Sequence, residues 1–162
     1  MQEAPPTAFV FNAKNLTWSE HACTGSTFNP LPKTQHTADV ISDEEILLIG
    51  GYSQHQARSS AAVTLNTRTW TFTKRCHMPV STMYAHATAV DKDRQCVYLF
   101  GGANHFHSYR DLYCLDLKTW SWEKMPQGNS VDTTPAARLY HRACTVVFES
   151  PTRRGRRGPP GT

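Results

Sequence analysis

Two short apolar runs, each ended by a pair of glycines, stand out along the chain. The runs are Ile46–Ile49 and Cys96–Phe100, and the glycine pairs that end them lie 51 residues apart. Both runs are apolar at consecutive positions, which predicts strands that are covered on both faces. The joins between runs, such as "DKDRQ" and "NTR", are rich in turn-forming residues. Helical periodicity is absent, so the pattern predicts an all-β chain.

The residues around the second glycine pair divide into four strands. The last of them alternates with a period of two, so Trp120 and Trp122 should point to the same face, as should Trp70 and Phe72 one unit earlier. The four predicted strands are, in order, 86–90 ("HATAV"), 96–102 ("CVYLFGG"), 111–117 ("DLYCLDL") and 119–125 ("TWSWEKM").

Three further markers recur with a spacing near 50 residues. A histidine opens each unit, an Asn or Asp ends the third strand, and an aromatic residue follows that Asn or Asp by six positions. The histidines are His36, His86 and His141, the Asn and Asp residues are Asn12, Asn66 and Asp116, and the aromatic residues are Trp18, Phe72 and Trp122. A period of about 50 residues with four short strands per unit is typical of the blades of a β-propeller.

Each marker has an architectural interpretation. In each glycine pair, the first residue should permit a close approach of two backbones, and the second should let the chain turn out into the next loop. The aromatic residues should cover the apolar face between adjacent sheets. The histidines recur in every unit, which favours a structural hydrogen bond over catalysis. The residues so assigned are Gly50, Gly51, Gly101, Gly102, Trp18, Trp70, Phe72, Trp120, Trp122, His36, His86 and His141.

The order of histidine, apolar run, Gly-Gly, apolar-Asn/Asp and Trp resembles the kelch repeat. The resemblance covers residues 8–149, between an N-terminal extension (1–7) and an Arg/Gly/Pro-rich tail (150–162) that we expect to be disordered. It implies an all-β fold of four-stranded, antiparallel propeller blades. The chain departs from the usual kelch pattern at Leu65 and Leu115, where a tyrosine is common, and at Asn66 and Phe72.

The units do not add up to a closed ring. Residues 8–20 supply a third and a fourth strand, 35–75 and 84–125 each make a full blade, and 138–148 supply a first strand. A closed propeller needs about 4–8 blades. We therefore expect an incomplete ring: a fragment or short isoform of a longer propeller, or a chain completed by further blades in cis or in trans.

The charge of the chain lies mainly in its tail. The net charge is +4, and the tail alone carries Arg153, Arg154, Arg156 and Arg157. The body is therefore neutral, which argues against nucleic-acid binding. The sequence contains no long apolar stretch that predicts a membrane span, and residues 1–9 do not resemble a signal peptide. These features favour the cytoplasm, with the nucleus as an alternative.

The sequence shows no pattern of a catalytic or metal site. The five cysteines have irregular spacing and no CxxC pair, so we expect free thiols. His105 and His107 with Cys114, or Cys76 with His77, are weak zinc candidates because they lack the paired spacings of closed zinc sites. We predict no metal, no cofactor and no enzymatic activity. The alternative is a fragment of a secreted or enzymatic propeller similar to galactose oxidase.

The kelch resemblance implies a protein-interaction module. In that family, the loops between the second and third strands and those between blades gather on one face, which binds a protein or peptide. The resemblance allows a substrate adaptor or a cytoskeletal or trafficking scaffold. Here the loops are rich in Tyr, Phe, His and Arg, residue types suited to binding. The candidate partner-binding residues are His55, Arg58, His105, Phe106, His107, Tyr109, Arg110 and Arg138.

Overall fold

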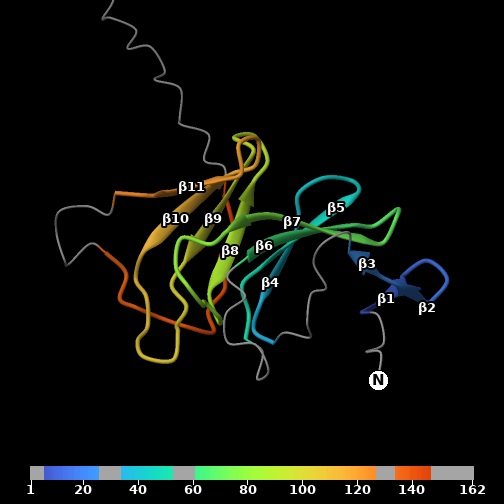
Figure 1. Cartoon of the computed structure of the whole chain (residues 1–162), viewed down its shortest axis with the longest axis horizontal. Coiled ribbons are helices and arrows are strands. Elements are labelled where there is room, and N and C mark those ends of the chain that lie inside the picture. The colour runs from blue at the N-terminus through green and yellow to red at the C-terminus, as the bar shows by residue number, and fades with distance from the viewer. Residues whose placement is uncertain (1–5, 26–33, 53–60, 127–133, 147–162) are drawn as a thin grey trace, which may run out of the picture.

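The structure, a computed structural model, describes residues 6–25, 34–52, 61–126 and 134–146. Within these residues the chain is entirely β, with strands in three separate sheets, none of them closed (Figure 1). The all-β prediction is confirmed. None of these residues belongs to a helix long and apolar enough to span a membrane.

Two of the sheets contain complete four-stranded blades. In each blade the strands follow chain order and pair antiparallel, as the repeat predicted. The first blade consists of β4 (Thr37–Val40), β5 (Glu45–Ile49), β6 (Ala61–Asn66) and β7 (Thr71–His77). The second blade consists of β8 (Ala87–Asp91), β9 (Cys96–Phe100), β10 (Leu112–Asp116) and β11 (Ser121–Lys124).

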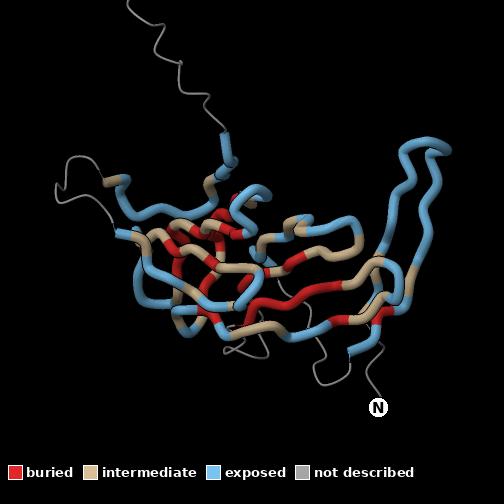
Figure 2. The backbone as a smooth tube through the Cα atoms, turned by 90° about the horizontal axis from the view of Figure 1, so that it is seen from above, coloured by how far each residue is buried: buried red, intermediate tan, exposed pale blue. Residues whose placement is uncertain are grey.

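The N-terminal strands form a hairpin that projects from the first blade. β1 (Thr7–Asn12) and β2 (Thr17–Ala22) pair antiparallel in a sheet of their own, and the tube in Figure 2 shows both arms exposed. The chain then adds β3 (Thr24–Gly25) to the outer edge of β7, in parallel orientation. This fifth strand is not visible in the repeat pattern, because it arises from pairing between residues that are 47 positions apart, such as Thr24 and Thr71.

The prediction of a strand at residues 138–148 is wrong for the residues that the structure describes, because residues 138–146 form no strand. Backbone and side-chain bonds still hold the segment against the second blade: the Tyr140 N–H donates to the Ala85 carbonyl (2.9 Å), and the Thr145 hydroxyl donates to the Val90 carbonyl (2.8 Å). A first strand of a blade normally pairs with the second strand of that blade, and no such strand lies beside this segment among the described residues.

The largest apolar cluster lies between the two blades. It joins fully buried side chains of the first blade, such as Leu47 and Ile49, to Val97, Leu99 and Leu115 of the second. The innermost strands, β4 and β8, also contact each other. The blades are therefore stacked face to face, as the propeller interpretation requires.

The sequence pattern predicted a strand covered on both faces at Ile46–Ile49, and β5 is covered in this way: Leu47 lies in the cluster between the blades, and Leu48 packs against a cluster on the other face. The strand β6 is buried on both faces as well. Its residues Ala61, Val63 and Leu65 pack in a second cluster with Cys23 and Phe72. The alternate residue Ala62 packs in the cluster between the blades. The N-terminal segment therefore covers the face of the first blade that turns away from the second.

The Asn or Asp that ends each third strand closes a four-residue turn. Asn66 Oδ1 accepts hydrogen bonds from the N–H groups of Arg68 and Thr69, and Asp116 Oδ1 accepts the equivalent bonds in the second blade. Four positions after each Asn or Asp, the backbone is left-handed; these residues are Leu16, Trp70 and Trp120. Either an amide or a carboxylate oxygen can accept these bonds, which explains why Asn66 can replace the usual aspartate.

We expect Asn66→Ala to lower the free energy of unfolding by about 1 kcal/mol, because two turn N–H groups lose their acceptor. The matched variant Asn66→Asp should lie close to wild type, since aspartate has this role in the second blade. Urea unfolding followed by tryptophan fluorescence measures both. Equal losses in the two variants would contradict the role of the side-chain oxygen.

Candidate functional site

The joint between blades is built from the first glycine pair and the histidine of the next unit. Gly50 has a left-handed φ of 63°, and a Cβ at this position would lie 2.5 Å from the Met83 carbonyl oxygen and 2.7 Å from Cε1 of His86. The Gly51 N–H donates to the same carbonyl (2.9 Å). The glycine pair therefore permits both the approach and the hydrogen bond that connect the two blades.

The same joint recurs one unit later. A Cβ at Gly101 would lie 2.6 Å from the Arg138 carbonyl oxygen and 2.9 Å from Cε1 of His141, and the Gly102 N–H donates to that carbonyl (2.8 Å). Gly102 is itself closely approached, since a Cβ on this residue would lie 2.8 Å from Cβ of His86. The second glycine of the pair thus combines a left-handed turn with close packing.

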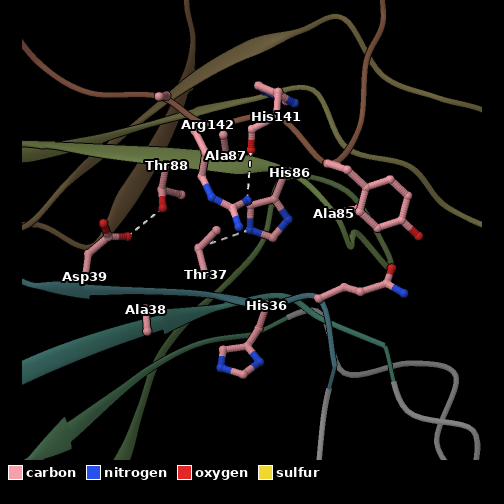
Figure 3. A pocket seen from close by; sticks show the side chains of 13 residues that line it. His36, Thr37, Ala38, Asp39, Ala85, His86, Ala87, Thr88, His141 and Arg142 are labelled. Atoms are coloured by element: carbon pink, nitrogen blue, oxygen red, sulfur yellow. Dashed lines mark hydrogen bonds between the residues drawn. The ribbon is translucent and has the colours of Figure 1, made fainter.

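A cleft of about 520 Å³ lies where the first segments of the three repeat units meet. It is lined by residues 35–39, 85–88 and 140–143, and Figure 3 shows side chains from all three segments pointing into it. Two hydrogen bonds cross between blades here: Thr88 Oγ1 donates to Asp39 Oδ2 (2.5 Å), and Thr37 Oγ1 shares a bond with Nε2 of His86 (3.2 Å). Several polar side chains of the cleft therefore form hydrogen bonds that connect the two blades.

His86 is the buried titratable group of this cleft. Its side chain is 3% exposed, and its Nδ1 has no hydrogen-bond partner among the described residues. Its pKa is lowered from 6.5 to about 4, chiefly by burial and to a lesser extent by the nearby His36 and His141, against a smaller opposing effect of the Ile49 backbone. His86 is therefore neutral at physiological pH. His36, by contrast, is exposed, and His141 is half-buried with its ring edge-on to Phe100.

Aromatic rings from three loops meet on the face that carries the loops between second and third strands. Tyr52 follows the first glycine pair, Tyr84 lies in the connection between blades, and His105 follows the second glycine pair. The ring centroids are 5.7 Å apart for Tyr52 and Tyr84, 5.3 Å for Tyr52 and His105, and 6.0 Å for Tyr84 and His105. Together with Asn104, Phe106, His107 and Tyr109, these three residues form what we call the loop face.

The loop at residues 103–109 is held in one shape by its own hydrogen bonds. Asn104 Oδ1 accepts bonds from the N–H groups of Phe106 and His107 (both 2.9 Å), and its Nδ2 donates to the Tyr109 hydroxyl (2.8 Å). The Tyr84 hydroxyl donates to the Asn104 carbonyl (3.1 Å). The Phe106 side chain, 91% exposed, stands at the tip of this braced loop.

The remaining predicted partner-binding residues are placed as follows. His107 packs edge-on against Tyr109 with ring centroids 4.7 Å apart, and Arg110 is exposed at the end of the same loop. The Arg138 guanidinium lies 5.9 Å from the Phe100 ring centroid, beside the second joint. His55 and Arg58 lie outside the described residues.

The aromatic residues assigned to the blade faces divide into two groups. Trp70 and Phe72 pack in the cluster beside Cys23, and Trp120 and Trp122 pack in the cluster between the blades. Trp18, in contrast, is 69% exposed and covers no neighbouring sheet, contrary to its assigned role. The reason is that the hairpin β1–β2 has no second blade face beside it among the described residues.

The weak zinc candidates do not come together as a metal site. Over residues 6–25, 34–52, 61–126 and 134–146, no three His, Cys, Asp or Glu side chains gather in a way that could hold a metal ion. The Cys114 thiol, one of these candidates, has its pKa raised to about 12 by burial and by neighbouring Cys96, which disfavours the thiolate that zinc requires.

Sequence reasoning missed Asn104 and Tyr52 and gave Tyr84 no specific role. The signal for Asn104 was local: Asn is a common turn former because its side chain can accept a hydrogen bond from the backbone two residues later. No local signal could reveal the meeting of Tyr52 with His105, because it depends on how two blades stack.

Two comparisons with known proteins bear on this arrangement. The model of a family described as the KLHDC2/KLHL20/DRC7 Kelch-repeats domain matches residues 2–149. Among curated proteins, acyl-CoA-binding domain-containing protein 5 of Arabidopsis thaliana is 32% identical over 77 residues, which are 46% of this chain and 12% of that protein. Acyl-CoA-binding domain-containing protein 4 of the same plant is 25% identical over 139 residues, 85% of this chain and 20% of that protein. The chain thus spans a fifth or less of the relatives it matches.

Proposed function

Since the chain belongs to the kelch-repeat family, whose domains generally serve as non-catalytic interaction modules, we propose that its loop face binds a peptide segment of a protein partner. The observation that carries the proposal is Phe106, a large apolar side chain that is 91% exposed on a loop held by Asn104. A rigid, exposed aromatic residue loses little conformational freedom on binding and can bury a large area.

The surroundings of Phe106 suit a peptide. Its chain neighbour His105 forms a ring cluster with Tyr52 and Tyr84, and each of the three rings carries a polar group, a hydroxyl or the imidazole nitrogens. Apolar anchoring by Phe106 with polar contacts around it is the usual composition of an interaction hot spot.

Roles as a substrate adaptor or as a cytoskeletal or trafficking scaffold remain within this proposal, because each uses the same kind of peptide-binding face. Acyl-CoA binding, which the names of the two plant relatives mention, is supported by no contact of the described residues. The chain shares with those proteins a segment that is a small part of their length.

Selection from a linear peptide library displayed on phage, with the whole chain immobilised, tests the proposal. We expect enriched peptides to bind wild type and to bind Phe106→Ser at least about tenfold more weakly. The matched control is Val40→Ser, which removes an apolar side chain that is 56% exposed at the opposite end of the first blade. Control and wild type should bind alike. Peptides that bind all three proteins equally, or a library that yields no binder, would contradict the proposal.

A further inference from the structure

The loop face contains no formally charged side chain. None of its residues is Lys, Arg, Asp or Glu, and all of them except Asn104 have an aromatic ring; they are Tyr52, Tyr84, Asn104, His105, Phe106, His107 and Tyr109. A peptide that placed a charged side chain against these rings would remove water from the charge and gain no ion pair with them. Complementarity in charge therefore favours an uncharged peptide.

Most of the hydrogen-bond acceptors on the loop at residues 102–107 are already used within the protein. The carbonyls of Gly102, Ala103 and His107 each accept a bond from a backbone N–H, at 2.7–3.0 Å. Both oxygens of Asn104 accept as well: its carbonyl from the Tyr84 hydroxyl, and its Oδ1 from two backbone N–H groups. The loop therefore has little to offer to the N–H groups of a peptide.

Hydrogen-bond donors, in contrast, are left over on the same face. The Tyr109 hydroxyl accepts a bond from Asn104 Nδ2 (2.8 Å), which leaves its own hydrogen to donate. The Tyr52 hydroxyl has no hydrogen-bond partner among the described residues. The exposed rings of His105 and His107 each add at least one N–H. A matching partner must therefore supply apolar groups and hydrogen-bond acceptors.

A proline-rich segment supplies this combination. Each proline keeps its carbonyl, has no backbone N–H and adds a rigid apolar ring. In the polyproline II conformation the carbonyls have no partner within the peptide, so they are available to donors on a protein surface. An ordinary peptide has an N–H for every carbonyl, and each N–H that is covered without an acceptor costs free energy. A proline-rich peptide avoids most of this cost.

We propose that the loop face binds a proline-rich segment of its partner in the polyproline II conformation. Proline rings pack against Phe106 and the neighbouring aromatic rings, and the peptide carbonyls accept bonds from the hydroxyls of Tyr52 and Tyr109. Binding of such preformed, extended segments by aromatic surfaces is a recurrent mode of peptide recognition. The inference rests on the proposed function, because it names the class of peptide that the same face takes.

Titration of labelled decapeptides with the whole chain, followed by fluorescence anisotropy, tests the proposal. The probes are a capped proline decapeptide, a capped decapeptide of alternating Gly and Ser, which restores the N–H groups and removes the rings, and one of alternating Glu and Ser, which is acidic. We expect the proline decapeptide to bind at least about tenfold more tightly than either of the others, and to lose this advantage with Phe106→Ser.

Tyr52→Phe tests the hydroxyl separately from the ring. The variant keeps the aromatic ring and removes one donor, so the proline decapeptide should bind about fivefold more weakly. The matched control is Tyr98→Phe, which removes a hydroxyl that accepts a bond from Arg94 (3.3 Å), at the end of β9 opposite the loop face. It should bind like wild type. Equal affinity of Tyr52→Phe and wild type would contradict the role of this hydroxyl.

Two results would overturn the choice of a proline-rich partner: equal binding of the proline and Gly-Ser decapeptides, or tighter binding of the acidic one. The phage-selected peptides then separate the two levels of the argument. If those peptides still bind more weakly to Phe106→Ser, the loop face binds peptides of another class. If they bind Phe106→Ser and wild type equally, the proposed function fails as well.

Discussion

Replacing Gly50 by alanine is expected to lower the free energy of unfolding by at least about 2 kcal/mol. A left-handed conformation costs a residue with a Cβ roughly 1–2 kcal/mol, and Gly50 has a φ of 63°. The added Cβ would also lie 2.5 Å from the Met83 carbonyl oxygen, a backbone atom that cannot move without shifting the connection between the blades. In a domain of this size the midpoint of thermal unfolding should fall by roughly 4–8 °C.

The control for Gly50 is Gly25→Ala. Gly25 is exposed on the short strand β3, and its φ is not in the left-handed region. Its substitution should change stability by less than about 1 kcal/mol. Differential scanning calorimetry of the two variants compares them directly. Similar unfolding temperatures for both would refute the role of Gly50 in the joint between the blades.

Acidification is expected to destabilise the fold through His86. The pKa of this histidine is about 4 in the folded chain and near its ordinary value of 6.5 when the chain unfolds. Between these pH values the histidine is protonated in the unfolded state and neutral in the folded state. The free energy of unfolding therefore has its full value above pH 6.5 and decreases as the pH falls toward 4. A difference of this size corresponds to about 3 kcal/mol over the whole interval.

Urea unfolding at a series of pH values from about 7.5 to about 4.5, which spans most of the interval between the two pKa values, measures this effect, with His86→Gln as the comparison. Glutamine can retain a hydrogen bond to Thr37 but does not titrate. The variant should be less stable than wild type at neutral pH and should lose less stability on acidification. The half-buried His141, whose pKa is also lowered by burial, contributes the same slope in both proteins. Parallel pH profiles would show that His86 is not the responsible group.

The candidate site could be predicted from sequence in part. The loop containing Phe106 was identified by its place after Gly101-Gly102 and by its residue types, and the structure gives it a defined shape through Asn104. The grouping of Tyr52, Tyr84 and His105 could not be predicted, because their contacts cross two blades. Trp18 was assigned to a buried face from its spacing alone, and spacing does not reveal whether a neighbouring sheet is present.

The amino-acid sequence by itself determined the elements that depend on near neighbours. The apolar runs, the glycine pairs and the Asn or Asp before each turn act over a few residues, and so the two blades and their turns follow from the repeat. Only the tertiary structure decided the rest: β3 beside β7, the neutral state of His86, the exposure of Trp18 and the absence of a strand at 138–146. Each of these depends on which surface lies next to a segment, and that is set by contacts between residues far apart in the chain.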